Sequence, residues 1–91
     1  MKIDFKAIPI AFDFAQPQPA DVRKIVGNTI NQSTSDIGLA EVAKRIYFSE
    51  EPTEVPGEYR EEIVQIITNT KHIVAPAKIA LLHALREEET E

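Results

Sequence analysis

The side chains of this sequence that could do chemistry are two histidines, several groups of carboxylates and one hydroxyl cluster beside an acid. His72 and His83 lie far apart, and no His-x-x-x-His or Glu-x-x-His motif gives the spacing of a metal-binding pair. No cysteine is present, which excludes thiolate metal sites and cysteine nucleophiles. We therefore expect no metal ion and no cofactor, and we interpret both histidines as surface or partly packed residues.

The carboxylates are grouped in a way that is typical of solvated surfaces. The groups are Glu50, Glu51 and Glu54, then Glu58, Glu61 and Glu62, and finally Glu87–Glu89. A hydrolase with paired carboxylates needs two acids held in a cleft, and a chain of 91 residues with short connections offers little room for one. Thr34 lies near Asp36 without a histidine or lysine base, and helix capping explains both residues. We predict that the protein is not an enzyme.

The charge of the chain argues against direct binding to nucleic acid. Fifteen acidic residues outnumber ten lysines and arginines, which gives a net charge of −5, and the basic residues form no stripe. The one short basic–aromatic cluster holds Lys44, Arg45 and Tyr47. It could contact a phosphate, but the simpler interpretation is that Arg45 pairs with Glu41 while Tyr47 or Phe48 closes the core. Loop 31–36 precedes a predicted helix, but it lacks the glycines and the lysine of a phosphate-binding loop.

Residues 2–14 form the first segment that could position an interaction surface, and we predict that they are extended. Hydrophobic and polar residues alternate along the segment. The alternation changes phase at Ala7–Ile8, which indicates a break rather than one uniform strand. Pro9 lacks a backbone donor and is expected on an edge strand. The prolines in Gln16–Pro19 are expected to end the extended segment, and no turn sequence predicts a tight hairpin.

One face of this segment carries a large hydrophobic load. The residues on it, which are the candidate interaction residues, are Ile8, Ile10, Phe12 and Phe14. Packing of this face on the helices is one interpretation. The other starts from the backbone groups of the strand, for which one short segment supplies few partners. In that case the strand pairs with another chain, either a second copy or a different protein.

Hydrophobic residues at helical spacing predict four helices in the rest of the chain. The clearest covers residues 36–48, where Asp36 is a favourable capping residue. The others are predicted over residues 19–31, 57–69 and 75–88. Pro19 suits the first turn of its helix, and Gly27 within the same helix is interpreted as close packing against a neighbour. The last helix has a broad hydrophobic surface that includes Ile79, and we expect it to be the most buried.

These elements predict one domain over residues 1–91. Its class is α+β, with a short N-terminal β element followed by a compact bundle of about four helices. No hydrophobic stretch is long enough to span a membrane, and the first residues do not form a signal peptide. We expect a cytoplasmic protein without a membrane partner.

Several short stretches together carry a family resemblance. They are Val26-Gly27-Asn28-Thr29-Ile30, Ser35-Asp36-Ile37-Gly38-Leu39, Ala43-Lys44, Ile46-Tyr47 and Glu54-Val55, followed by a closing helix. In this pattern, which covers residues 22–85, the chain resembles small phage- or prophage-encoded proteins of uncharacterised function. The resemblance implies an accessory role in a phage or integrated element, such as particle assembly, and it transfers no catalytic position. Gln16–Pro19 departs from the glycine-containing hairpin of such proteins, which argues against a regular hairpin here.

The function that these observations favour is a non-enzymatic protein-interaction module. It would be an accessory protein of a phage or prophage that self-associates or binds a partner through its N-terminal strand. The alternative, motivated by the net charge of −5, is an acidic regulator that occupies a nucleic-acid-binding protein by charge mimicry. Binding by mimicry should weaken steeply with salt, whereas strand pairing should not. A small enzyme ranks third.

Overall fold

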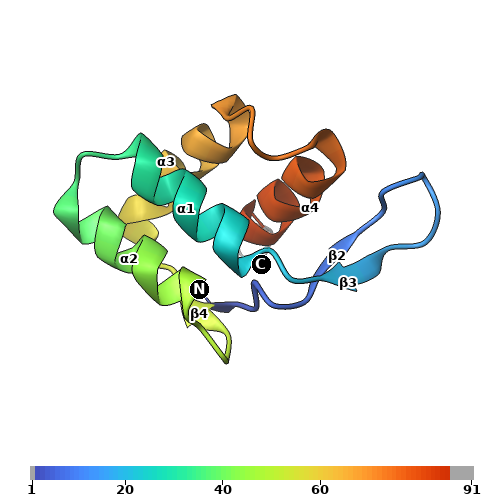
Figure 1. Ribbon diagram of the computed structural model, residues 1–91, viewed down its shortest axis with the longest axis horizontal. Coiled ribbons are helices and arrows are strands. Elements are labelled where there is room, and N and C mark those ends of the chain that lie inside the picture. The colour runs from blue at the N-terminus through green and yellow to red at the C-terminus, as the bar shows by residue number, and fades with distance from the viewer. Residues whose placement is uncertain (1, 87–91) are drawn as a thin grey trace.

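The computed structural model describes residues 2–86 of the chain. In order, its elements are β1 (Lys2–Ile3), β2 (Ile8–Ile10), β3 (Gln18–Ala20), α1 (Arg23–Ser33), α2 (Ile37–Tyr47), β4 (Thr53–Glu54), α3 (Gly57–Asn69) and α4 (Ala75–Arg86). Figure 1 shows α1 between α2 and α4, while the β2–β3 ribbon reaches out beyond the helices. The predicted α+β class is confirmed. The predicted end of the last helix, at residues 87–88, lies outside the described residues.

One hydrophobic core joins the four described helices to the N-terminal segment. Its buried side chains come from every helix and from the β elements: Ile3, Phe5, Ile8, Ile10, Val22, Val26, Ile30, Leu39, Val42, Ala43, Ile46, Val55, Ile63, Val64, Ile67, Ile73, Ala77, Leu81 and Leu85. The hydrophobic effect of this burial is the main force that holds the short strands onto the helices.

Helix α2 starts where its sequence predicts. The Asp36 Oδ1 atom accepts hydrogen bonds from the backbone N–H groups of Gly38, at 2.8 Å, and Leu39, at 3.3 Å, as an N-cap should. The Tyr59 hydroxyl of α3 donates to the same oxygen at 3.4 Å. A Cβ atom at Gly38 would collide with that hydroxyl. The start of α2 is therefore fixed by its cap, and Gly38 lies close to the Tyr59 ring of α3.

The start predicted for the first helix was wrong, because α1 begins at Arg23 rather than at residue 19. Residues Gln18–Ala20 instead form β3. The fixed φ angle of Pro19 fits an extended strand as well as a first helical turn, so this residue alone did not decide between them. The backbone N–H of Val22 donates to the Phe5 carbonyl at 2.9 Å, which keeps the chain in extended pairing almost to the start of α1.

The extended N-terminal segment is divided between two antiparallel ribbons. β1 pairs with β4, and β2 pairs with β3 so that Pro9 lies opposite Pro19. The predicted break is confirmed, because β1 ends at Ile3 and β2 begins at Ile8. The expectation that no regular hairpin forms was wrong: β2 and β3 are joined by loop 11–17 into a hairpin.

Gly27 is the position where α1 and α2 come closest. A Cβ atom built there would lie 2.9 Å from the Ala43 carbonyl oxygen and 2.9 Å from the Tyr47 Cβ. Both distances are shorter than normal van der Waals contact. Close helix packing, the predicted role of this glycine, is therefore confirmed.

Candidate interaction surface

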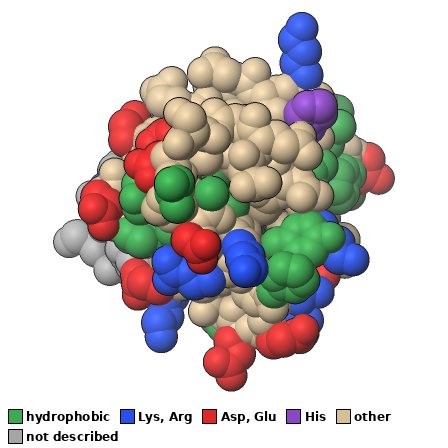
Figure 2. Space-filling view, turned by 60° about the vertical axis from the view of Figure 1, so that its left-hand side comes forward, with side chains coloured by type: hydrophobic (Ala, Val, Ile, Leu, Met, Phe, Trp, Pro, Cys, Tyr) green, Lys and Arg blue, Asp and Glu red, His purple; other side chains and the backbone are tan. Residues whose placement is uncertain are grey.

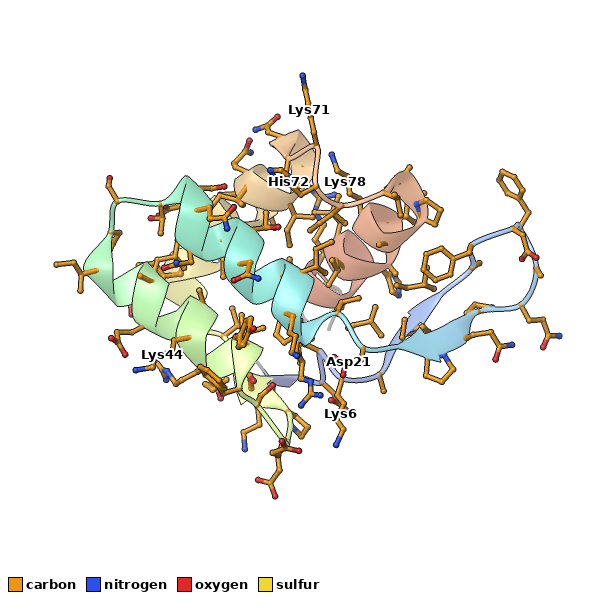
Figure 3. All side chains as sticks on the ribbon, in the orientation of Figure 1. Lys6, Asp21, Lys44, Lys71, His72 and Lys78 are labelled. Carbon is orange, nitrogen blue, oxygen red and sulfur yellow. The ribbon has the colours of Figure 1, made fainter. Side chains whose placement is uncertain are left out.

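The structure does not bring the residues with possible chemistry together. His72 lies in the turn before α4 (Figure 3), whereas His83 lies near the other end of that helix. Among residues 2–86, no three side chains of the metal-binding types are placed to hold an ion. The Thr34 hydroxyl donates to the Glu62 carboxylate at 3.2 Å and accepts from the Asp36 N–H at 3.0 Å. That hydroxyl therefore has a structural role at the α1–α2 turn.

The four candidate interaction residues divide into two pairs. Ile8 and Ile10 are only 3% and 1% exposed, so their prediction as partner contacts was wrong. Phe12 and Phe14 are 58% and 102% exposed. The strand ends at Ile10, and beyond it the backbone no longer holds alternate side chains over the core. The hydrophobic surface open to a partner is therefore the loop of the hairpin and not its strand.

The backbone of the loop turns Phe14 outward. The Asp13 carboxylate accepts a hydrogen bond from the Ala15 N–H at 3.3 Å, a local side-chain turn that has Phe14 at its centre. Phe14 has a φ angle of 63°, the only positive value among the described non-glycine residues. This left-handed conformation costs a bulky residue about 1–2 kcal/mol. Backbone strain at an exposed aromatic ring suggests that the strain and the exposure serve a function.

A hydrophobic groove of about 650 Å³ lies between the hairpin and α4, and we call it the hairpin groove. Phe12, Phe14 and Pro17 line it from the hairpin, and Pro76, Ile79 and His83 line it from α4. Ile79 is 70% exposed. None of the residues that line the groove is a lysine, arginine or carboxylate. A hollow of this volume and composition suits hydrophobic side chains rather than ions.

The outer edges of the β2–β3 ribbon are poor templates for a further strand. Pro9 and Pro19 are opposite each other at the centre of the ladder. Because neither proline has an N–H group, the residue pairs on either side of them form the hydrogen bonds between β2 and β3. The backbones of both prolines then face the outer edges, where an added strand would find no donor. A partner is therefore better bound through side chains at the loop than through strand addition.

Ion pairs hold the base of the hairpin to the helices. The Arg23 guanidinium donates to the Asp21 carboxylate at 2.7 and 2.9 Å and to the Ser49 carbonyl. Glu50 lies 3.8 Å from Arg23 and 3.6 Å from the Lys6 ammonium, and Figure 3 shows Lys6 and Asp21 on the same side of the molecule. The side-chain hydrogen bond from Arg23 lowers the pKa of Asp21 to about 2. Charged contacts at the surface thus accompany the burial of Ile8 and Ile10 at the base of the hairpin.

Sequence reasoning missed the contribution of α4 to this surface. Ile79 was expected in a broad buried face, but the core contacts of α4 are Ala77, Leu81 and Leu85. Ile79 and His83, four positions apart, lie on a separate stripe that lines the hairpin groove. Hydrophobic residues on two different sides of α4 were the sequence signal that could have indicated a second contact surface.

The opposite side of the molecule shows mixed charge. The face in Figure 2 carries both acidic and basic side chains beside hydrophobic areas. Tyr47 and Phe48 contact each other edge to face, with ring centroids 4.8 Å apart, and the Lys24 ammonium lies 5.9 Å from the Tyr47 centroid. Phe48 is 68% exposed, so it does not close the core.

Comparisons of the chain with family models, with curated proteins and with solved structures found no match. Within the part of the chain that the structure describes, no helix has the length and hydrophobicity needed to cross a membrane.

Proposed function

We propose that this protein is a non-enzymatic interaction module that binds a protein through the hairpin groove and the exposed ring of Phe14. The observation that carries the proposal is the pair of exposed phenylalanines on a loop that stands clear of the helices (Figure 1) and borders a hydrophobic groove. Hydrophobic surface concentrated in this way is typical of protein–protein contact sites. In the setting that the resemblance to phage proteins implies, the module would act as a cytoplasmic accessory protein.

The geometry supports side-chain docking over the strand pairing that the sequence suggested. Ile8 and Ile10 are buried under the helices, and prolines occupy the outward-facing positions of the ribbon. Phe12, Phe14 and Ile79 are the large hydrophobic residues left open around the groove. Aromatic anchors of this kind contribute most of the free energy in many protein interfaces.

Charge mimicry, the alternative function, rests on the net charge of −5 alone. The face in Figure 2 mixes acidic and basic side chains. Glu50, in the acidic segment before β4, already lies near Lys6 and Arg23. We therefore develop the interaction module alone.

The proposal is tested by site-specific photo-crosslinking in the cells that naturally express the protein. A benzophenone amino acid replaces Phe14 in one variant and Phe48, an exposed aromatic residue on the opposite side, in a control. We expect an adduct of discrete mass from position 14 and none from position 48. A second variant that adds Ile79→Asp should lose the adduct, because the charge disrupts the hydrophobic groove. Equal labelling at positions 14 and 48 would overturn the proposal.

A further inference from the structure

We infer that the occupant of the hairpin groove is a second copy of this chain, with Phe14 of each protomer seated in the groove of the other. The inference rests on the proposed function, because it names the partner of the same face. Three features support it: a protruding ring, a hydrophobic hollow next to it, and an acidic residue on the loop that can pair with an arginine near the end of α4.

The ring and the hollow lie on one surface, and this arrangement fits a two-fold contact. In a closed dimer the same patch meets itself, so one patch must supply both the projecting and the receiving parts. Phe14 projects from the loop, and the groove between the loop and α4 lies directly beside it. A rotation that places the first protomer's Phe14 in the second protomer's groove places the second Phe14 in the first groove.

The charges around the groove are complementary in this arrangement. The loop carries Asp13 between its two phenylalanines. Helix α4, over Ala75–Arg86, has no acidic residue, and its exposed His83 and Arg86 are three positions apart, on one side of the helix. In the two-fold contact, the Asp13 carboxylate of each protomer approaches the Arg86 guanidinium of the other. Lys78 is directed elsewhere, because its ammonium donates to the Thr68 carbonyl at 2.9 Å.

The overall negative charge does not prevent this association. Two chains of net charge −5 repel each other at long range. At physiological ionic strength, however, charges are screened beyond about 8 Å. The residues that line the groove include no carboxylate that would oppose the approach of Asp13. The lining of the groove itself therefore adds no like-charge repulsion to this contact.

The test uses the absence of cysteine from the natural sequence. Two full-length single-cysteine variants, Phe14→Cys and Ile79→Cys, are mixed in a glutathione redox buffer, and the yield of the mixed disulfide is measured by mass spectrometry. The matched control mixes Phe48→Cys with Ile79→Cys. We expect the 14–79 disulfide to exceed the 48–79 disulfide by about tenfold or more, because only the first pair is brought together by the interface.

Because Phe14→Cys removes part of the proposed contact, a second measurement leaves Phe14 in place. Ala15→Cys and Ile79→Cys are combined in the same assay, and the 15–79 disulfide should again exceed its control. Equal yields in both assays would overturn the second-copy inference. If the photo-adduct at position 14 then contained a different protein, the proposed function would stand without this inference. If no adduct formed either, both would fail.

Discussion

Ile8 and Ile10, at the base of the hairpin, and Phe12 and Phe14, in its loop, are equally hydrophobic and follow one alternating pattern, yet they have opposite environments. The two isoleucines belong to a strand that is paired with β3 and covered by helices. The two phenylalanines follow the end of that strand, where a side-chain turn and a positive φ angle redirect the chain. Alternation therefore predicts which side of a strand a residue occupies, but only as far as the strand continues.

The largest expected effect on stability comes from comparing a substitution at the base of the hairpin with one in its loop. Ile10→Ala should lower the free energy of unfolding by about 2–4 kcal/mol, because it leaves a cavity in a closed core. Phe12→Ala should change it by no more than about 0.5 kcal/mol, although it removes a larger side chain, because that ring is exposed. Urea unfolding followed by circular dichroism measures both values. Similar losses for the two variants would mean that the loop is part of the core.

Two glycines allow the same comparison, because one is tightly packed and the other has free space at its Cβ position. Gly27→Ala should lower the free energy of unfolding by about 1–3 kcal/mol, because the added methyl group meets α2 at 2.9 Å. Gly57→Ala is the matched control, because nothing lies within 4 Å of its Cβ position. Thermal or urea unfolding compares them. If Gly27→Ala were as stable as the control, the close approach of α1 and α2 would be refuted.

Phe14→Gly tests whether the Phe14 ring in the loop contributes to the stability of the fold. Glycine adopts a φ angle of 63° without the steric cost that phenylalanine has there. We expect the free energy of unfolding of the monomer to stay the same or to rise by up to about 1 kcal/mol. The comparison is made by urea unfolding at protein concentrations where the wild type is monomeric. A clear loss of stability would show that the ring supports the fold, contrary to its proposed role in binding.

The smallest effect concerns the ion pair at the base of the hairpin. The pKa of Asp21 is lowered to about 2, from an ordinary value of 3.8. Its stabilising effect is therefore present above about pH 4 and is lost as the pH falls towards 2. In Asp21→Asn, the difference in unfolding free energy between pH 6 and pH 3 should become smaller.

Asp13→Asn, in the loop and outside that ion pair, is the matched control for Asp21→Asn, and both are measured at protein concentrations where the wild type is monomeric, so that the contact proposed for Asp13 does not contribute. It should keep the pH dependence of the wild type when unfolding by urea is followed at both pH values. If both variants behaved alike, the Arg23 contact would not be what lowers the pKa of Asp21.

Much of the fold was predictable because local patterns agree with the final packing. The cap at Asp36, the close contact at Gly27 and the break between Ile3 and Ile8 each depend on a residue and its near neighbours. The hairpin was not predictable in this way. Its strands are short, and Pro19 fits either a strand or the start of a helix, so long-range pairing with Pro9 decided the outcome.

The candidate surface was only half predictable for a related reason. Phe12 and Phe14 were identified by their hydrophobicity, but the sequence could not separate them from Ile8 and Ile10, because burial depends on where the strand ends. Ile79 was assigned to the core, although α4 turns a different stripe towards the helices. Its proximity to the loop comes from tertiary packing, which the second hydrophobic stripe of α4 does not specify by itself.

The most direct test of the central claim, that two copies associate through the loop while the base supports the fold, is the mass of the protein in solution as a function of concentration. Light scattering is applied to the wild type, to Phe14→Ser and to Phe48→Ser. We expect the mass of the wild type and of Phe48→Ser to rise towards twice the monomer mass as the concentration increases. Phe14→Ser should remain a folded monomer with an unchanged circular dichroism spectrum. A wild type that is monomeric throughout, or a Phe14→Ser variant that dimerises equally well, would contradict it.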